Sequence, residues 1–288
     1  MIVSSLNPMP PVPIVIVAFG TNAKARDTYE HLGTRIQAHF PGHEVICALS
    51  SRIIKENKGG EQYPTASPRE ILEALYRQHH PWAVVQSLHL IGGHEFIRLV
   101  AEADKSPIRT SIGLPLLSSP ADFTALCNGL APLIDAHPHQ AVLLAGHGTD
   151  HPAWCAYPAL QYFLRLHFGP RVFIGVIEEG CPSRSEVIAD IKAAGHKKVC
   201  IVPLLLVAGM HFHRDLAADS DNSWLNQLAR ADIQVEIMEQ GIGMLPAVSD
   251  LFCRHIEEAL SAIPDNPLFS AKITKKMTLH SLDKPNSL

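Results

Sequence analysis

The chain has 288 residues, of which 47% are hydrophobic and 18% are charged, and its formal net charge is -4. Such a chain can bury a large core, which excludes a largely disordered protein. The negative charge and the lack of a clustered basic segment argue against a nucleic-acid partner. No apolar stretch reaches the roughly 20 residues that cross a bilayer, so no membrane partner is expected. Residues 1–13 lack the pattern of a secretory signal, which predicts a cytoplasmic protein.

Short apolar runs, many of them β-branched, alternate with longer helical patterns. This alternation is typical of parallel strands joined by crossover helices. We expect four strands in each half of the chain: Ile14–Phe19, Glu44–Leu49, Ala83–Leu88 and Thr110–Leu116, then Ala141–Ala145, Val172–Ile177, Lys198–Val207 and Gln234–Met238. The expected fold is α/β, with two similar Rossmann-like halves. Each half is a four-stranded, mainly parallel sheet flanked by helices, and the active-site cleft is expected between them.

The join between the halves is expected in Asp135–His139, a polar stretch that contains a proline. This divides the chain into an N-terminal α/β half, residues 1–137, and a C-terminal α/β half, residues 138–263, which carries the candidate metal ligands. In the tail, residues 264–288, helical periodicity fades and lysines accumulate. This pattern predicts a loosely ordered segment.

The six cysteines are spread singly along the chain, without a CxxC pair. Their spacing argues against a zinc ribbon, an iron-sulfur site or a disulfide framework, and most are expected to be small core residues. Many histidines fall in helical or loop contexts without partner spacing and are predicted to lie mostly on the surface. These are His31, His39, His79, His80, His167, His196 and His255.

Two other histidines stand where an apolar run ends. His147 lies in a short glycine-containing loop after one predicted strand, and His211 follows another. The carboxyl ends of parallel strands are where ligands bind, so both imidazoles are expected to face the same crevice. Between His147 and His211 in sequence lies another predicted strand, and Glu178 or Glu179 follows it. Two imidazoles and a carboxylate suit a divalent first-row metal, and an imidazole can also transfer a proton near neutral pH.

Five sequence phrases occur in a characteristic order: VIVAFGT at 15–21, VQSLH at 85–89, GLPLLSS at 113–119, GHG at 146–148 and PLLLVAGMH at 203–211. Together they resemble the anaerobic sirohydrochlorin cobaltochelatases of cobalamin biosynthesis, over roughly residues 13–262. These are class II chelatases with a ferrochelatase-like fold.

The resemblance implies insertion of Co2+, the substrate metal, into sirohydrochlorin without ATP or an organic cofactor. It also implies a homo-oligomer. Carried over to this sequence, the family's metal ligands fall on His147, Glu178 and His211. The two histidines would hold the metal and accept the pyrrole protons, and the glutamate would complete the site.

Two positions depart from the family pattern. In the family, one glutamate at the end of the strand lies a few residues before a proline. This chain has two glutamates there, and one residue more than the family pattern before Pro182. Counting from Gly175 selects Glu178, and counting back from Pro182 selects Glu179. Glu178 is favoured because a loop tolerates an extra residue better than a strand does. Met210 stands where the family commonly has an acidic residue, and its neutral side chain removes a charge that would favour a protonated imidazole nearby.

An acidic, wide substrate needs backbone donors, hydroxyl groups and an apolar wall. Helix starts offer exposed amide groups to anions, and the end of the third predicted strand offers a hydroxyl and an imidazole. Leu88 or Met210 could lie against the ring face. The candidate substrate-binding residues are Gly20, Thr21, Ser87, Leu88, His89, Ser118, Ser119 and Met210.

Other functions are compatible with parts of this pattern. The same donors would accept Fe2+, whose insertion gives sirohaem. A two-lobed protein that binds metal or tetrapyrrole without catalysis would need no proton acceptor, and it normally carries an export signal. A metallohydrolase is disfavoured because a short motif such as HExxH is absent.

Overall fold

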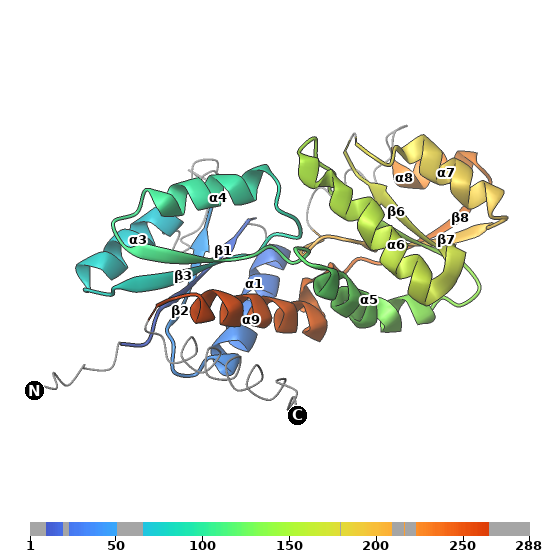
Figure 1. Ribbon diagram of the computed structural model, residues 1–288. Coiled ribbons are helices and arrows are strands. Elements are labelled where there is room, and N and C mark those ends of the chain that lie inside the picture. Colours follow the sequence, from blue (N-terminus) through green and yellow to red (C-terminus); the bar gives the residue numbers. More distant parts are fainter. Residues whose placement is uncertain are drawn as a thin grey trace, which may run out of the picture.

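A computed structural model describes residues 10–19, 23–50, 66–178, 180–208, 216 and 223–264. Two sheets lie side by side along an elongated body, each with helices on both faces (Figure 1). The first half holds β1 (Ile14–Ala18), α1 (Ala23–His39), β2 (Val45–Leu49), α3 (Pro68–Arg77), β3 (Trp82–Ser87), α4 (His94–Asp104), β4 (Arg109–Gly113) and α5 (Pro120–Asp135). The second holds β5 (Ala141–Gly146), η1 (Pro152–Cys155), α6 (Ala156–Phe168), η2 (Gly169–Arg171), β6 (Val172–Val176), α7 (Arg184–Ala193), β7 (Lys198–Pro203), α8 (Trp224–Arg230), β8 (Gln234–Ile237), η4 (Ile242–Met244) and α9 (Pro246–Ser261).

The two sheets share one strand order. The first runs β2-β1-β3-β4 and the second β6-β5-β7-β8, and every strand pair is parallel. The predicted α/β fold with two similar four-stranded halves is therefore confirmed.

Two strands, β4 and β7, end three or more residues earlier than predicted. β7 ends at Pro203, and the carbonyl groups of Leu205 and Leu206 then accept hydrogen bonds from η4, at 2.8 and 3.0 Å, instead of continuing the sheet. β4 ends at Gly113, where a Cβ atom would lie only 1.9 Å from Oε1 of Gln86. Beyond these strands, Leu116, Leu204 and Leu206 are buried in the core that the two halves share, whereas Leu114 is exposed.

Each sheet is covered by two helix layers. Leu72 of α3 and Leu99 of α4 pack on one face of the first sheet, and Ile191 of α7 and Leu228 of α8 pack on the corresponding face of the second. The other faces of both sheets share one continuous core with α1, α5, α6 and α9. Burying such a core on both faces explains why the central strands have near-continuous hydrophobic sequences.

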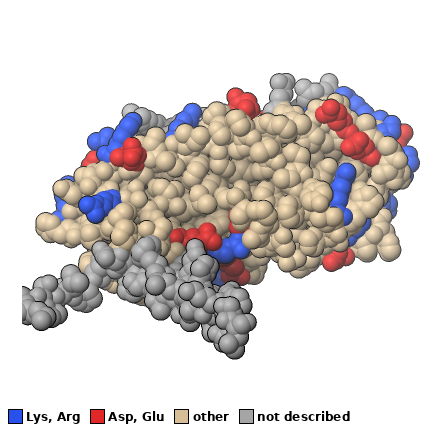
Figure 2. All heavy atoms as spheres, in the orientation of Figure 1, with Lys and Arg blue, Asp and Glu red and all other residues tan. Residues whose placement is uncertain are grey.

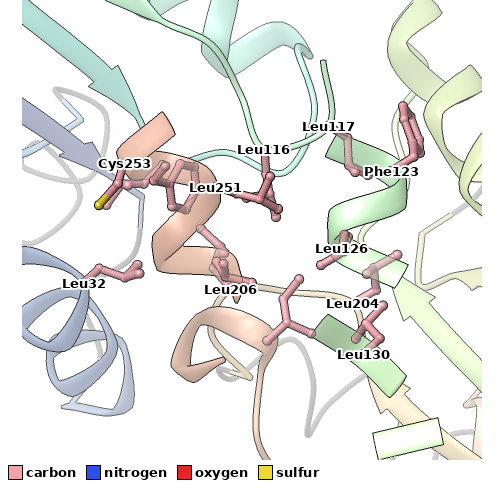
Figure 3. Close-up of a cluster of buried hydrophobic side chains, with 14 of the residues drawn as sticks. Leu32, Leu116, Leu117, Phe123, Leu126, Leu130, Leu204, Leu206, Leu251 and Cys253 are labelled. Carbon is pink, nitrogen blue, oxygen red and sulfur yellow. The ribbon is translucent and has the colours of Figure 1, made fainter. Parts of the chain in front are cut away.

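The shared core joins the halves through α5, α9 and the chain after β7. Figure 3 shows Leu126 of α5, Leu251 of α9 and Leu206 converging in this region. α9 is the last described helix, yet it lies against β3 and β4 of the first sheet, where Ser111 Oγ donates to Ala259 O at 2.8 Å. α5 lies beside α6 of the second half (Figure 1). The helices that follow the last strand of each half therefore extend onto the opposite half. The domain boundaries at residues 137 and 263 stay a prediction.

Serine residues fix the starts of three helices. Ser67, Ser119 and Ser183 each form a capping box with the acidic residue three positions later, which satisfies backbone N–H groups that the first helical turn leaves free. No helix in the described ranges is both long and apolar enough to span a bilayer.

Cys127, Cys200 and Cys253 are buried, whereas Cys47, Cys155 and Cys181 are exposed, and all six are free thiols. Half of the cysteines, not most of them, are therefore core residues. The prediction that His255 lies on the surface is also wrong, since only 3% of this residue is exposed. It occupies the inner face of α9, together with Phe252 and Ile256.

Candidate metal centre at the carboxyl ends of the strands

His147 directly follows β5, and the two glycines beside it have a packing role. A Cβ atom at Gly146 would lie 2.4 Å from the ring of Tyr157, and Gly148 has a φ of +91°, which favours glycine. The N–H of Gly148 donates to the Tyr157 hydroxyl at 3.1 Å. Burial raises the pKa of Tyr157, so this hydroxyl stays neutral. The buried tyrosine therefore anchors the backbone that presents His147.

Glu178 lies beside His147 because the pairing of β5 and β6 continues past both strands. Ile177 N donates to Gly146 O at 2.8 Å, and Glu178 N donates to His147 O at 3.0 Å. The side chains then approach, with Nδ1 of His147 3.7 Å from Oε2 of Glu178. About half of each side chain is exposed, 49% and 55% respectively. An imidazole and a carboxylate thus stand together at the carboxyl edge of the second sheet.

The carboxyl ends of the two sheets meet near this pair. His94, the first residue of α4, places its Nε2 2.8 Å from Oδ1 of Asp150, which lies in the loop after β5. The ring of His94 also lies 4.9 Å from that of His151, edge to face. The loops that follow β3 and β5 are therefore in contact, as expected if one ligand is to touch both halves.

His89, just beyond β3, has an unusual environment for an imidazole. Its Nδ1 lies 2.6 Å from Oγ of the buried Ser87, whereas its Nε2 is buried without a hydrogen-bond partner among the described residues. Burial lowers the pKa of His89 to about 4, although Glu95 opposes the effect, so the ring is neutral near pH 7. Its ring lies 6.3 Å from that of Phe19, at the end of β1. The first sheet therefore contributes a neutral imidazole and an aromatic ring at its carboxyl edge.

The loop between β4 and α5 holds Ser118 and Ser119, whose polar groups are engaged within the protein. Both backbone N–H groups donate to Oδ2 of Asp122, and Oγ of Ser118 donates to Pro115 O at 2.7 Å. Oγ of Ser119 caps α5. Leu88, another candidate, is 2% exposed and belongs to the core. Substrate contacts by these three residues stay predictions.

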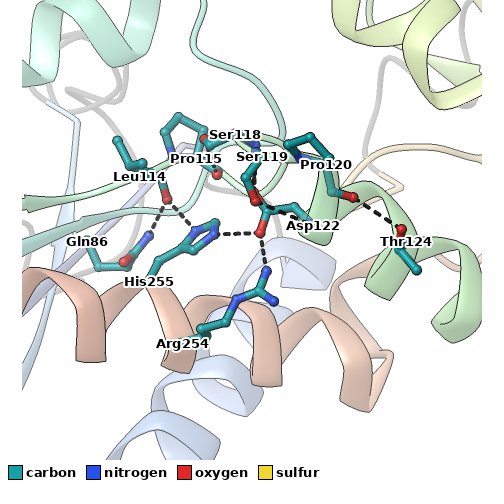
Figure 4. Close-up of polar contacts among 10 residues, drawn as sticks. All are labelled: Gln86, Leu114, Pro115, Ser118, Ser119, Pro120, Asp122, Thr124, Arg254 and His255. Carbon is teal, nitrogen blue, oxygen red and sulfur yellow. Dashed lines mark hydrogen bonds and ion pairs between the residues drawn. The ribbon is translucent and has the colours of Figure 1, made fainter. Parts of the chain in front are cut away.

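A buried network fixes this loop to α9 (Figure 4). Nε2 of His255 lies 3.0 Å from Oδ1 of Asp122, its Nδ1 lies 2.9 Å from Leu114 O, and Arg254 pairs with the same carboxylate. Burial alone would raise the pKa of Asp122, but hydrogen bonds from His255, Ser118 and Ser119 outweigh it and lower that pKa. Sequence reasoning missed this network.

Five predicted site residues lie outside the described residues. They are Gly20, Thr21, Glu179, Met210 and His211. The structure thus brings His147 and Glu178 together in one half and Ser87 and His89 together in the other, and the loops that follow β3 and β5 are in contact through His94.

This fold is that of the class II metal chelatases. A solved structure with the same fold is SirB from Bacillus subtilis with Fe3+, which aligns with a TM-score of 0.62 at 20% identity over 86% of this chain and 95% of that one. Residues 13–261 match the family described as cobalt chelatase (CbiK). The chain belongs to this cobalt chelatase family.

Two relatives cover nearly the whole chain. Sirohydrochlorin cobaltochelatase CbiKC of Nitratidesulfovibrio vulgaris is 29% identical over 266 residues, which are 90% of this chain and 94% of that protein. Sirohydrochlorin cobaltochelatase of Salmonella typhimurium is 29% identical over 257 residues, which are 86% of this chain and 96% of that protein. The resemblance inferred from the sequence phrases is therefore confirmed, and the protein is a metal chelatase.

Proposed function

We propose that this protein inserts Co2+ into sirohydrochlorin, using His147, Glu178 and His211 as metal ligands. The observation that carries the proposal is the pair of donor atoms at the carboxyl edge of the second sheet, Nδ1 of His147 and Oε2 of Glu178, 3.7 Å apart. The chain that carries this pair belongs to the cobalt chelatase family, and two of its relatives are named sirohydrochlorin cobaltochelatases.

The spacing of this pair suits a shared divalent ion. Nitrogen and oxygen ligands that each lie about 2.1 Å from a metal are separated by roughly 3.0–3.4 Å, depending on the coordination geometry. Closing the observed gap therefore takes a shift of a few tenths of an ångström, which half-exposed side chains accommodate by small rotations. His211 would supply the third ligand, and the remaining coordination positions would stay open for pyrrole nitrogens.

Metal insertion releases two protons from the tetrapyrrole and needs no oxidant or reductant. Co2+ loses bound water, the two pyrrolic N–H groups lose their protons, and the four nitrogens bind the ion. His147 and His211 would accept these protons as the ion passes from their ring nitrogens to the pyrrole nitrogens, because an imidazole released from the metal is a base near neutral pH. Because no bond requires activation by a nucleotide, we propose that the reaction uses neither ATP nor an organic cofactor.

The carboxyl edge of the first sheet supports binding of a tetrapyrrole. Nε2 of His89, which has no hydrogen-bond partner within the described ranges, can form a hydrogen bond with a polar group of the substrate, and the neutral ring avoids burying a charge. Phe19 is 36% exposed and offers an apolar surface beside it. Gly20, Thr21, Ser87, Leu88, Ser118, Ser119 and Met210 are the further proposed contacts.

We also propose a cytoplasmic homo-oligomer. A row of exposed apolar side chains four residues apart runs along η1 and α6, formed by Trp154, Pro158, Tyr162 and Leu166. Figure 2 shows few charged side chains over the middle of the face on which α4, α5 and α6 lie. An uncharged, apolar surface of this kind supports contact with a second copy of the chain.

The test is anaerobic absorbance spectroscopy of sirohydrochlorin mixed with the purified protein and Co2+, Fe2+ or Ni2+ in turn. We expect rapid metallation with Co2+ that is lost in His147→Ala and in His211→Ala. The control His167→Ala changes an exposed histidine near the end of α6 and should keep the full rate.

Either of two results would contradict the proposed insertion of Co2+ and indicate another function. Faster metallation with Fe2+ than with Co2+ would make the protein an iron-inserting enzyme that forms sirohaem. A spectral shift on binding, with metallation no faster than in buffer, would indicate a non-catalytic tetrapyrrole-binding protein.

A further inference from the structure

A second group of metal-binding side chains lies on the second sheet, away from His147. His137 precedes β5, Cys200 lies within β7 and Glu236 lies within β8. One ligand atom from each lies within 4.8 Å of the other two. A thiol, an imidazole and a carboxylate from three separate segments thus meet at one point of the fold.

The sheet itself brings these groups together. Cys200 and Glu236 are register partners in the pairing of β7 with β8, so their side chains project from the same face. His137 is placed over that face by Arg171, which donates to His137 O at 3.0 Å and to Ile134 O at 3.2 Å. The backbone that carries all three groups is therefore fixed by hydrogen bonds outside the cluster.

The spacing of sulfur and nitrogen is that of two ligands of one ion. Sγ of Cys200 lies 3.4 Å from Nε2 of His137. Tetrahedral Zn2+ bonds of about 2.3 Å to sulfur and 2.0 Å to nitrogen separate these atoms by roughly 3.5 Å. Glu236 is 59% exposed, so its carboxylate is free to rotate toward an ion held between the other two groups. Solvent water would complete a four-coordinate shell from the exposed side.

Gln140 supplies the outer support that metal-binding histidines commonly have. Its side-chain amide nitrogen lies 2.6 Å from Nδ1 of His137 and 3.1 Å from Oε2 of Glu236. When Glu236 rotates toward the ion and gives up the amide N–H that Gln140 donates to it, a half-turn of the amide would present its carbonyl oxygen to an Nδ1–H group, which leaves the lone pair of Nε2 directed at Cys200. Such contacts fix the tautomer and orientation of a ligating imidazole.

The thiol favours an ion that bonds strongly to sulfur. Burial raises the pKa of Cys200 to about 11, and Glu236 adds to the effect, so the thiol is protonated in the metal-free protein. A bound ion must displace this proton, because the thiolate is the ligand. Zn2+ and Co2+ form strong thiolate bonds, whereas Mg2+ and Ca2+ prefer oxygen ligands.

We propose that His137, Cys200 and Glu236 form a second site that binds one thiophilic divalent ion, Zn2+ or Co2+. It is separate from the proposed insertion site, because the six-residue strand β5 lies between His137 and His147. Six strand residues span roughly 20 Å. The ion links the segment that joins α5 to β5 with two strands of the second sheet, and so stabilises the fold as a ligand that binds only the native state.

The test is titration of the metal-free protein with Co2+ alone, without tetrapyrrole, followed by the thiolate-to-cobalt charge-transfer absorption. We expect this band to saturate at the intensity of one thiolate-bound Co2+ per chain, since the insertion site has no thiolate ligand, and we expect Co2+ binding to raise the melting temperature. Cys200→Ala should abolish the band, and Glu236→Gln should weaken Co2+ binding at this site about 10-fold or more. Cys253→Ala is the matched control, because it also removes a buried thiol but leaves the cluster intact.

Retention of the band in Cys200→Ala would overturn the proposal, because the exposed thiols would then be the ligands. Glu236→Gln changes an exposed side chain and remains informative if Cys200→Ala does not fold; an unchanged affinity in this variant would also overturn the proposed ligand set. Both variants should keep the metallation rate with sirohydrochlorin. Loss of that rate together with the band would place these residues on the insertion pathway and contradict a separate site.

Discussion

Asp122 on α5 and His255 on α9 are 133 residues apart in sequence and form a buried pair, with Oδ1 3.0 Å from Nε2. The same carboxylate accepts the N–H groups of Ser118 and Ser119, so one side chain fixes both the loop after β4 and the contact between α5 and α9. The pair therefore connects the carboxyl edge of the first sheet to the helices that cross between the halves.

Asp122→Ala should destabilise the protein by about 3–5 kcal/mol, because it leaves His255 and two backbone donors buried without their acceptor. Urea unfolding measures the change. Asp250→Ala removes an exposed carboxylate of α9, 3.5 Å from Arg35, and should cost less than about 1 kcal/mol. Equal losses in the two variants would contradict the importance of the buried pair.

The pH dependence of the same pair has a definite sign. The hydrogen bonds to Asp122 lower its pKa in the folded state, so its stabilisation is present above the unfolded-state value of about 4. This stabilisation is lost as the pH falls through the lower folded-state pKa. The difference in unfolding free energy between wild type and Asp122→Ala should therefore shrink on acidification. A constant difference down to pH 2 would contradict the lowered pKa.

Tyr157→Phe should affect catalysis more than stability. The substitution removes only the hydroxyl that accepts Gly148 N–H, which costs about 1 kcal/mol of stability. Because that contact orients the backbone beside His147, we expect metallation to slow about 10-fold. Tyr162→Phe removes the hydroxyl of an exposed tyrosine and should leave the rate unchanged. A normal rate in Tyr157→Phe would show that the hydroxyl does not position the histidine.

His89 should remain neutral down to a pH of about 4, because burial disfavours its charged form. The unfolded chain binds this proton near pH 6.5, so between pH 6.5 and 4 the unfolded state holds more protons and stability falls as the pH falls. Protonation of this group in the unfolded chain lowers the free energy of unfolding by about 3 kcal/mol in total over this pH range. Urea unfolding at several pH values should show that the free energy of unfolding depends less steeply on pH in His89→Gln than in wild type. An imidazole NMR titration with a midpoint near 6.5 would contradict this prediction.

The exposed row on α6 predicts a change in assembly on substitution. Tyr162→Lys and Leu166→Glu place charges at positions that are 62% and 65% exposed, so the folded monomer should tolerate both. Light scattering should show a smaller species in the double variant than in wild type. Arg165→Ala is a control beside the row, because it changes a half-buried side chain whose guanidinium faces Phe173. A monomeric wild type would contradict an oligomer that uses this surface.

The strands could be predicted from sequence because they are buried on both faces, which gives continuous β-branched runs. Their ends could not be predicted where a tertiary contact decides them. Gln86 packs against Gly113 and ends β4, and the residues after Pro203 bind to η4. The packing of α5 and α9 on the opposite half could not be predicted either. Hydrophobic periodicity indicates that a helix is amphipathic, but not which sheet it covers.

The proximity of His147 and Glu178 could be predicted because both come just after strands, β5 and β6, that pair with each other; their role as metal ligands stays a proposal. The Asp122–His255 network and the His137–Cys200–Glu236 cluster could not be predicted, because each joins segments that are distant in sequence. His137 and Cys200 are 63 residues apart. His255 was predicted as a surface residue because it falls in a helical pattern without partner spacing, but its face of α9 packs on the first sheet.

The choice between Glu178 and Glu179 tests the proposed insertion site most directly. The measurement is the initial rate of Co2+ insertion into sirohydrochlorin by Glu178→Gln and Glu179→Gln, prepared in parallel with wild type. The rate should fall at least about 100-fold in Glu178→Gln and stay near wild type in Glu179→Gln. A normal rate in Glu178→Gln would contradict the pairing of His147 with Glu178 as the metal site.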